Sequence, residues 1–585
     1  MNFGYSFPYK PESFTPEERK VLSLFFTNYD KPVFAIHNLP QEVVGAMFSR
    51  YSRTTKSIRR VFLDEFWSAD ELGIKKFSSF DNKAYEKAKE RTRDFYRKVF
   101  AEYGDDSVIQ MGSVHIAFEF VSQLIGAKAI EDQRVASAYI AKSTRYVDFR
   151  SKVNDHFLFV EPPEIMSSRF AKEFLTWNKL LFDAYSRYIP VVIEYLSKKY
   201  PLNAQKIEDT KNGKLISFNN LNDYDKVIVR SAHERALKAK ALDLMRFFLP
   251  STTAVNLGAH FSGQATETTI NKMLSSPFSE VRFLGAMALK ELVKIFPNFL
   301  QNIGNSFGKI ARDYRKEVRN KMLETSGRWE RKISNIGNKN SVRIINWDKD
   351  ADVKIASQIL FTGSYRNLSK EQIYKWAQGV KKKEGKVWSP TLVKIIYQSL
   401  PDRKSKGRNR RQKLPRAFEH AYIEIEFYTD MGTYNDLQRN RLSSTEKQAI
   451  AADDVYIPSE YMDMENLLDE YKRLAENTRK LHNKMFKTKF LRDAAEYISI
   501  MGNKIRFNVK ANLRQWVFFA ELRTIAGGHP TYRYALQEAT RQIIAKMPFT
   551  KELFAHVDWT SDYGLGRLKA EIRTQEELAK LKEKK

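Results

Sequence analysis

The sequence predicts an α+β protein made of two related domains, each a mainly antiparallel sheet with long helices, that arose by duplication. Three observations favour this fold class. Short runs with strand-like alternation precede helical runs in the same order in both halves of the chain. Strands and helices are segregated along each half, which is typical of α+β folds. A chain of 585 residues with 42% hydrophobic residues is too long for one core and apolar enough to build several.

The first half opens with a β-branched run that predicts a strand over 33–36. The 3.6-residue spacing that follows predicts a helix ending in an aromatic and arginine-rich corner at 46–53. A charged amphipathic helix is expected over 81–103, ended by Gly104. The segment 113–120 predicts the next strand.

The second half repeats this order. A β-branched run predicts a strand over 342–345, and the same aromatic corner returns at the end of a helix over 359–366. The segment 421–427 alternates cleanly between apolar and polar residues. One face of this strand is therefore expected to be buried and the other polar.

Long helices are expected to fill the remainder of both halves. Their predicted ranges are 168–200 (broken at Pro190), 279–296, 465–485 and 530–547. The stretch 302–340 is rich in Gly, Asn, Lys and Arg and is predicted to link the halves. The expected domains are an N-terminal repeat over 1–305, a linker over 306–340, a C-terminal repeat over 341–570 and a charged helical tail over 571–585.

The composition excludes several classes of protein. With no cysteine, the chain has no disulfide, zinc–thiolate site, iron–sulfur cluster or cysteine nucleophile. No phosphate-binding loop or zinc-protease pair is present, no metal ligand set is predicted, and no side chain is identified as catalytic. The start of the sequence lacks a signal-peptide core and no apolar stretch could span a bilayer, so we expect a soluble, cytoplasmic protein.

The charge predicts anionic partners. The formal net charge is +29, and part of the excess lies in the basic runs 381–386 and 403–413. Such a run is either a solvated loop or a flexible arm that collects anions, including nucleic acid. Charge alone does not decide between the two.

A group of arginines carries the most specific chemistry in the sequence. Arg439 and Arg441 follow the alternating strand, and Asn512, Arg514 and Arg523 lie in a later helical stretch. Planar guanidinium groups bind phosphate through two hydrogen bonds and keep their charge at any cellular pH. The alternative is that these arginines pair with local acids, for which the sequence offers Glu419, Asp436 and Glu521.

The pattern as a whole resembles the flavin-dependent thymidylate synthases. Their motif runs Arg-His-Arg-x-x-Ser and then, a few residues on, Ser-x-Arg-Tyr. In the second half, residues 439–444 are similar to the first part, with Asn440 in place of the histidine. The Ser, Arg and Tyr of the second part fall on Ala449, Ala451 and Ala452.

The first half shows the reverse. Ser143, Thr144, Arg145 and Tyr146 are similar to the second part of the motif, while residues 132–134 replace the arginine–histidine pair. The division continues along both halves. Further positions similar to the family are Arg246 before Leu249-Pro250 in the first half, and Glu419, His420, Asn512, Arg514, Arg523 and His529 in the second.

The resemblance implies an activity and an assembly. Family members methylate dUMP with methylenetetrahydrofolate and NADPH, use FAD, and share active sites between the subunits of a homotetramer. By this resemblance FAD is held by Glu419, His420, Arg439, Asn440, Arg441, Asn512 and Arg514, and dUMP by Ser143, Thr144, Arg145, Tyr146, Arg246 and Arg523. A homodimer of tandem chains is expected to mimic the tetramer.

Two positions depart from the family pattern. Asn440 replaces the histidine expected beside the flavin, and Ala141 replaces an acidic residue two positions before Ser143. The alternative hypothesis is therefore a catalytically degenerate duplicate that binds nucleotide or nucleic acid through its positive charge. A structural scaffold is a third.

Overall fold

The computed structural model describes residues 9–69, 74, 110, 112–153, 155–208, 215–295, 297–333, 341–561 and 564–583. The helix expected over 81–103 lies outside these residues. Contacts divide the chain into two compact units. Unit 1 comprises residues 1–188, 245–337 and 458–501, and unit 2 comprises 189–244, 338–457 and 502–585.

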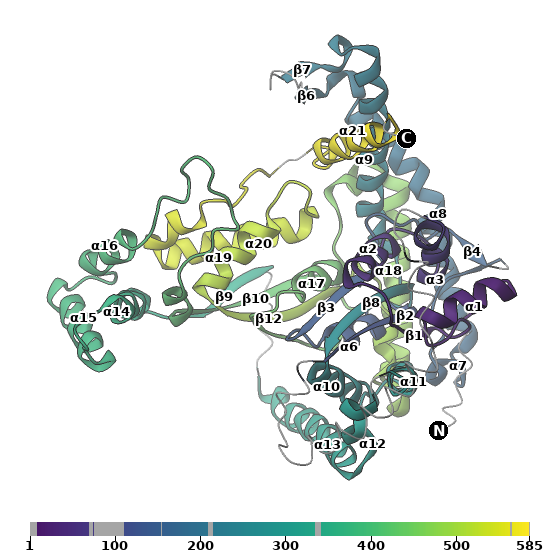
Figure 1. The fold of residues 1–585 in the computed structure, drawn as a ribbon, viewed down its shortest axis with the longest axis horizontal. Coiled ribbons are helices and arrows are strands. Elements are labelled where there is room, and N and C mark those ends of the chain that lie inside the picture. The colour runs from purple at the N-terminus through teal and green to yellow at the C-terminus, as the bar shows by residue number, and fades with distance from the viewer. Residues whose placement is uncertain are drawn as a thin grey trace. The chain divides into compact units, whose positions relative to one another are not determined.

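Unit 1 is built on a four-stranded antiparallel sheet. Its strands lie in the order β1 (Val33–Ile36), β2 (Ser113–Ser122), β8 (Ala254–Ser262) and β3 (Ser137–Ala141) (Figure 1). Every residue of β1 is buried, as its unbroken apolar sequence requires. The strands predicted over 33–36 and 113–120 are confirmed.

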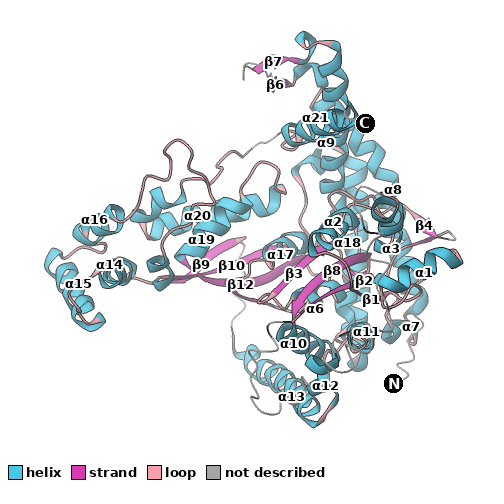
Figure 2. Cartoon of the chain, viewed as in Figure 1, coloured by secondary structure: helices cyan, strands magenta, loops and turns pink. Residues whose placement is uncertain are grey.

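Unit 2 contains a second sheet of the same design. Its strands lie in the order β9 (Val342–Trp347), β10 (Tyr422–Asp430), β12 (Lys504–Asn512) and β11 (Ser444–Lys447), all antiparallel. Figure 2 labels β9, β10 and β12 of this sheet. In β10 the buried residues alternate with more exposed ones over Tyr422–Phe427, which confirms the alternation prediction. The two sheets have the same strand order, so the α+β fold class with two related sheets is confirmed.

The two sheets share their register at the strand ends that lead into the next helix. In unit 1 Ser262 of β8 lies opposite Ser113 of β2, and in unit 2 Asn512 of β12 lies opposite Tyr422 of β10. Each of these strand ends caps the helix that follows: the Ser262 side chain accepts a hydrogen bond from the Ala265 amide, and Asn512 accepts one from the Gln515 amide. The two strand-to-helix corners are therefore equivalent residue by residue.

The compact units do not follow the repeat boundaries in the sequence. Unit 1 includes residues 458–501, which lie between β11 and β12 of the second repeat, and unit 2 includes 189–244 from the first. Within unit 1, Trp177 Nε1 donates to Thr478 Oγ1 at 2.9 Å and Tyr497 Oη donates to the buried Glu280 at 2.7 Å. Each unit thus contains helical sequence from both repeats, whereas the boundaries 1–305, 306–340, 341–570 and 571–585 divide the chain by repeat.

Helices cover the sheets, and most predicted ranges correspond to observed ones (Figure 2). In the first repeat the longer helices are α1 (Pro16–Phe25), α2 (Gln41–Tyr51), α8 (Ala171–Lys199), α9 (Asp223–Met245), α10 (Gly263–Leu274), α11 (Ser279–Leu292) and α13 (Ser306–Trp329). In the second they are α14 (Ala351–Gly363), α15 (Lys370–Glu384), α16 (Pro390–Gln398), α17 (Met431–Leu437), α18 (Glu465–Phe486), α19 (Leu513–Arg523), α20 (Pro530–Lys546) and α21 (Leu568–Glu583).

Two helix predictions need correction. The break expected at Pro190 is wrong, because α8 runs through it without interruption. Its buried face, formed by Leu181, Tyr185, Ile189, Val192 and Leu196, keeps helical spacing on both sides of the proline. The helix expected before the second corner ends short of Arg366, since α14 stops at Gly363 and the next residue is extended, so the aromatic and arginine residues of the corner follow the helix.

The interval predicted to be a linker is largely helical. Asn305 caps α13 by accepting hydrogen bonds from the Phe307 and Gly308 amides. Among the residues of α13, Gly308 alone is buried. A helix with solvent along its length is stable as a spacer when it is capped and carries local ion pairs, such as that between Lys321 and Glu317 at 2.8 Å.

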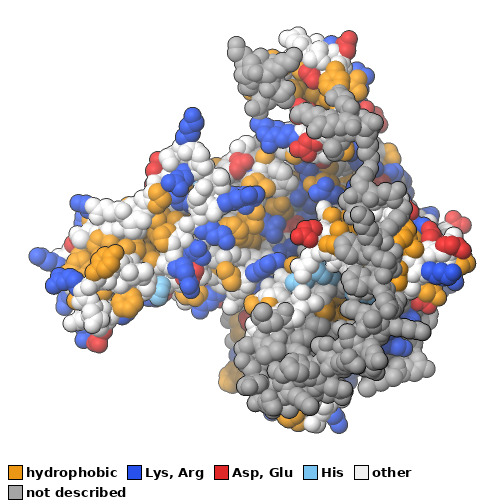
Figure 3. All heavy atoms as spheres, viewed as in Figure 1, with side chains coloured by type: hydrophobic (Ala, Val, Ile, Leu, Met, Phe, Trp, Pro, Cys, Tyr) orange, Lys and Arg blue, Asp and Glu red, His pale blue; other side chains and the backbone are white. Residues whose placement is uncertain are grey.

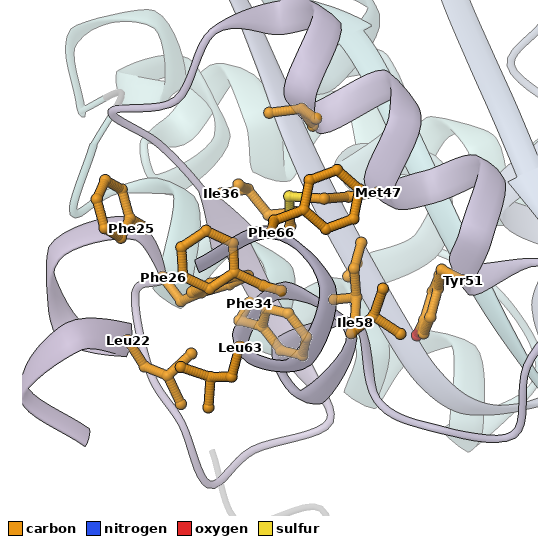
Figure 4. Packing of buried hydrophobic residues seen from close by; sticks show 14 of the residues in the cluster. Leu22, Phe25, Phe26, Phe34, Ile36, Met47, Tyr51, Ile58, Leu63 and Phe66 are labelled. Atoms are coloured by element: carbon orange, nitrogen blue, oxygen red, sulfur yellow. The ribbon is translucent and has the colours of Figure 1, made fainter. Parts of the chain in front are cut away.

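The core beside the first sheet is rich in aromatic residues. Phe25, Phe26, Phe34 and Phe62 have almost no exposed surface, and the Phe26 and Phe62 rings meet edge to face at 5.4 Å (Figure 4). Tyr51 belongs to the same cluster. Burial of such large side chains supplies the main stabilisation of this part of the fold.

Gly258 is the point of closest approach in the first sheet. It lies on the central strand β8 between Ala117 of β2 and Ile140 of β3. A Cβ atom there would lie 2.1 Å from the Phe48 ring, so Gly258→Ala is expected to lower the free energy of unfolding by about 1–3 kcal/mol. Gly45→Ala is the matched control: Gly45 is exposed on α2 with nothing near its Cβ direction, and alanine should stabilise the helix by about 0.5–1 kcal/mol. Urea denaturation of both variants measures the difference, and equal effects would contradict this packing.

Candidate functional site

In unit 2 a strand-to-helix corner gathers several of the predicted residues. Asn512 ends β12 and caps α19. One turn into the helix, Arg514 Nη1 donates to Glu419 Oε1 at 2.9 Å and its Nε donates to the Leu414 carbonyl at 2.6 Å. The pairing with Glu419 is one of the local acid pairs that the sequence left open. It orients a partly exposed guanidinium beside the start of β10.

The turn after α17 joins the same corner. The buried Asn440 side chain accepts a hydrogen bond from Gln515 Nε2 on the first turn of α19. Arg439 and Arg441, on either side of Asn440, have exposed side chains. The turn is therefore anchored by its central residue and presents a cationic side chain on each side.

His420 adds a polar ring next to Glu419. It ends the short 3-10 helix that begins at Arg416. Burial lowers the pKa of His420, and the positive charges of Lys370 and Lys354 act in the same direction. The neutral imidazole is favoured, and neutral imidazole both donates and accepts a hydrogen bond.

Arg523 lies apart from this corner. Because α19 is one uninterrupted helix, nine positions place Arg523 two and a half turns from Arg514, on the opposite face. Its guanidinium carbon lies 5.7 Å from the centre of the Tyr532 ring, and its Nε is buried without a hydrogen-bond partner among the described residues. The structure therefore does not bring Arg523 to Asn512 and Arg514.

The basic run 403–413 divides into two parts. Arg403 is 8% exposed and forms a two-point ion pair with the fully buried Glu521, at 2.9 and 2.8 Å. Glu521, one of the acids that the sequence offered to Arg523, is thus paired with Arg403. Most of the side chains from Lys404 to Lys413 are exposed. The run is therefore an exposed loop with its first residue as an internal anchor, which is compatible with both alternatives that the sequence left open.

In unit 1 the residues Ser143–Tyr146 form a turn directly after β3. Ser143 Oγ accepts a hydrogen bond from the Arg145 amide at 3.3 Å, and the Val147 amide donates to the Ser143 carbonyl at 3.0 Å. The Tyr146 ring is exposed, with the Arg53 guanidinium carbon 5.6 Å from its centre. The turn therefore has a fixed backbone and offers hydroxyl and guanidinium groups.

Backbone hydrogen bonds establish which residues of the second repeat occupy the same place. The Lys142 amide donates to the Asn256 carbonyl at 2.8 Å, and the Gln448 amide donates to the Arg506 carbonyl at 3.0 Å, at matched positions of the two sheets. The residues after Gln448 are therefore the counterparts of Ser143 onward. The counterparts of Ser143, Arg145 and Tyr146 are Ala449, Ala451 and Ala452, in agreement with the spacing of the sequence motif.

Arg246 lies inside the protein. It begins a 3-10 helix, Arg246–Phe248, and its side chain is 1% exposed. The guanidinium carbon lies 5.5 Å from the centre of the Phe247 ring. Binding of a nucleotide by Arg246, as the sequence predicts, would require the surrounding side chains to move.

A pair of histidines in ring contact lies on the first sheet near the corner that corresponds to Asn512. His115 of β2 and His260 of β8 are register partners with ring centres 4.7 Å apart. Burial, with the nearby His260, lowers the pKa of His115 to about 4, and burial lowers that of His260 as well.

This pair predicts a loss of stability in mild acid. The unfolded chain takes up the His115 proton near pH 6.5 and the folded chain only near pH 4, so the free energy of unfolding should fall as pH decreases through that window. His115→Gln removes the proton uptake at this position and should reduce the loss of stability in acid. Urea denaturation at pH 7 and pH 5 tests this, and an identical loss in the two proteins would contradict it.

Sequence reasoning did not find a pocket of 370 Å³ in unit 1 whose wall includes Glu119 and Lys142. A signal was present, because Glu119 interrupts an apolar strand and Lys142 immediately precedes the Ser143 turn. Within the described part of the chain, no group of three or more His, Cys, Asp or Glu residues is placed to hold a metal ion. Nor is any described helix long and apolar enough to cross a membrane.

A family model described as "Thymidylate synthase complementing protein" matches residues 53–298 and 358–549. These two segments cover most of the chain. The chain belongs to this family. Because the match falls on both repeats, it is a tandem member of the flavin-dependent thymidylate synthase family.

Relatives of similar length are found among the UPF0159 proteins. A UPF0159 protein from Chlamydia pneumoniae is 32% identical over 573 residues, which cover 97% of this chain and 99% of the relative. A UPF0159 protein from Thermoplasma acidophilum is 26% identical over 534 residues, covering 90% and 98%. The tandem arrangement therefore extends over nearly the whole length of these relatives.

Among solved structures, the chain is similar to the UMP/dUMP methylase PolB from Streptomyces cacaoi bound with 5-Br dUMP. The sequences are 14% identical, and the match covers 38% of this chain and 96% of that one. The TM-score is 0.27. A likeness at that level adds nothing to the assignment, which depends on the family match.

Proposed function

We propose that this thymidylate synthase family member catalyses FAD-dependent methylation of dUMP to dTMP, with methylenetetrahydrofolate as methyl donor and NADPH as reductant. The second repeat binds FAD and the first repeat binds the nucleotide. One observation carries the proposal: the two repeats share sheet order and register, yet the Ser143–Tyr146 turn of one corresponds to three alanines in the other. Each repeat retains the part of the family motif that its counterpart has lost.

The residues of the unit 2 corner fit a flavin dinucleotide. Its pyrophosphate requires cationic donors, and the exposed Arg439 and Arg441 side chains supply them beside the first turn of α19. Arg514 is held by Glu419, which fixes its direction. The neutral form of His420 supplies a hydrogen bond without adding charge. FAD, when bound, supplies the hydride chemistry of the reaction.

The Ser143–Tyr146 turn fits a nucleotide monophosphate. A hydroxyl and a partly exposed guanidinium are grouped within four residues, and phosphate oxygens accept hydrogen bonds from both. The hydrogen bond from the Arg145 amide to Ser143 Oγ keeps the turn compact. This arrangement orients the substrate, which is the main contribution of a protein that uses no nucleophile of its own.

The second repeat accommodates Asn440 at the position where the family has a histidine. The family histidine is replaced by a side chain that is buried and bonded to Gln515. We expect Asn440 to hold the arginine turn in place. Gln515→Ala should then weaken FAD binding without touching either arginine.

Absorbance spectroscopy tests the proposal. The purified protein should show a flavin band, and titration with dUMP should shift or quench it. Arg439→Ala should weaken FAD binding by about 10–100-fold, and Arg145→Ala should weaken dUMP binding by a similar factor while the flavin stays bound. Arg408→Ala, in the exposed basic loop, is the control and should change neither affinity. Unchanged dUMP affinity in both Arg145→Ala and Arg523→Ala would contradict the assignment of the nucleotide to these residues.

The proposed assembly is a homodimer. Two tandem chains supply as many repeats as the family homotetramer has subunits, and closed two-fold symmetry is the common outcome for such chains. Light scattering on the purified protein measures the mass directly, and a monomer at micromolar concentration would contradict this part.

The exposed basic loop supports a second candidate, nucleic-acid binding. Lys404–Lys413 present cations to solvent, and Figure 3 shows Lys and Arg side chains spread over the visible face of the second repeat. A nucleic-acid binder would purify with high absorbance at 260 nm and no flavin band. Binding of a single-stranded oligonucleotide that weakens steeply with added salt would favour this candidate.

A further inference from the structure

The pocket of unit 1 is formed where β2 departs from regular pairing. Between Phe118 and Val121 the strand has one residue more than its partner β8, and Phe120 adopts a left-handed φ of 59°. At the matched place in unit 2, β10 pairs with β12 without interruption. A bulge of this kind turns side chains away from the regular pleat, and a strained non-glycine residue is typical of functional sites.

The floor of the pocket is a buried and fully bonded ionic network. Glu119 is 3% exposed and accepts hydrogen bonds from Tyr9 Oη at 2.6 Å, Tyr51 Oη at 3.2 Å, the Ile58 amide at 3.3 Å and Arg59 Nη2 at 3.3 Å. Tyr51 and Ile58 belong to the aromatic cluster of Figure 4. Because Arg59 neutralises Glu119, this carboxylate is not available as a close partner for a second cation.

Lys142 lines the same pocket and has no such partner. Its side chain is 6% exposed, and in the described part of the chain its amine has no hydrogen-bond acceptor. Its Nζ lies 5.3 Å from the centre of the Phe149 ring. Burial lowers the pKa of Lys142 to about 8, an effect that Glu119 partly offsets. A buried amine without an acceptor is costly, and an anion bound in the pocket would remove that cost.

The remaining walls restrict the kind of anion. Apolar side chains from β5 (His156–Phe157), from the residues after it and from β8 line the pocket, including Phe157, Phe159 and Ala254. Glu12 and Glu161 also line it, and burial raises the pKa of each. Lys10 and His156 also line the pocket, but both side chains are exposed. The carboxyl groups disfavour a doubly charged phosphate, whereas one negative charge on an apolar body matches Lys142, the buried lysine of the pocket.

We propose that this pocket binds a small organic carboxylate with an apolar body, whose carboxylate accepts a hydrogen bond from Lys142. The site belongs to the first repeat alone, since the residue that corresponds to Lys142 in the second is the exposed Gln448. It is separate from the proposed nucleotide turn, although Lys142 directly precedes Ser143.

Benzoate is the probe, and isothermal titration calorimetry on the full-length protein is the measurement. Benzoate should bind, benzamide should bind at least 10-fold more weakly because it carries no charge, and Lys142→Met should weaken benzoate binding at least 10-fold. Lys179→Met is the matched control, because Lys179 is exposed on α8 and pairs with Asp183 at 2.6 Å. It should bind benzoate as the wild type does.

A second measurement on the wild type avoids any effect of substitution on folding. Benzoate should protect Lys142, but not Lys179, from reductive methylation followed by peptide mass spectrometry. Equal binding of benzoate and benzamide, or an unaltered affinity in Lys142→Met, would overturn the proposal. Inorganic phosphate binding more tightly than benzoate would overturn the choice of a carboxylate. Displacement of benzoate by dUMP would overturn the separation of this pocket from the nucleotide site. A wild-type protein that binds benzoate but not dUMP would count against the proposed synthase function alone.

Discussion

Replacing Arg403 with methionine is expected to lower the free energy of unfolding by about 3–5 kcal/mol. The substitution leaves the fully buried Glu521 without its two-point partner, and the amide of His556 at 3.0 Å then remains as a donor to Glu521. Arg403 also donates to the carbonyls of Leu553 and Gln412, so its loss releases both ends of the basic loop. Urea denaturation of the purified variant measures the change.

The adjacent residue supplies the control. Lys404 forms an ion pair with Glu552 at 2.8 Å, but both side chains are more than half exposed, so Lys404→Met should change stability by less than about 1 kcal/mol. The double variant Arg403→Met, Glu521→Leu should recover part of the loss, because no unpaired buried charge remains. Similar effects of Arg403→Met and Lys404→Met would show that burial of the pair is unimportant.

Arg59→Met is the second large expected effect, also about 3–5 kcal/mol of destabilisation. The Arg59 side chain is completely buried against the Phe34 ring, with its guanidinium carbon 3.9 Å from the ring centre. Its removal leaves Glu119 charged in the core, bonded to Tyr9, Tyr51 and one amide but without a cation. The floor of the proposed carboxylate pocket depends on this pair, so benzoate binding should weaken in the same variant.

Arg50→Met is the matched control for this position. Arg50 makes a comparable two-point pair with Glu65, at 2.6 and 3.0 Å, but its side chain is 58% exposed. The loss should stay below about 1 kcal/mol, since water screens the pair and solvates Glu65 once it is broken. Thermal unfolding of the two variants side by side separates burial from pairing. A loss in Arg59→Met as small as in Arg50→Met would refute the argument.

Much of the fold followed from local pattern. The alternation of 421–427 predicted β10, and the apolar run 33–36 predicted β1, because side chains on a strand point to opposite faces in turn. Helical spacing likewise predicted α18 and α20 to within a residue or so at each end. These elements are set by neighbours in sequence, which is why the sequence alone suffices.

Other features depended on partners remote in sequence. The spacing of Arg514 and Arg523 predicted their separation only once α19 was known to be unbroken. Nothing near Arg403 in the sequence indicates that it alone of its run finds a buried acid, since Glu521 lies far along the chain. Burial of Arg246 could not be predicted either, because the nearby acid Asp243 pairs with Arg567, far along the chain.

The sequence by itself determined that two related α+β repeats exist and that each retains a different part of one motif. Both conclusions follow from the types of residue and their spacing along the chain. Only the tertiary structure decided that each compact unit contains helical sequence from both repeats, and that one extra residue in β2 opens a pocket beside Lys142. The physical reason is that periodicity specifies which face of an element is buried but not which segment buries it, and a single bulged residue leaves the alternation on either side intact.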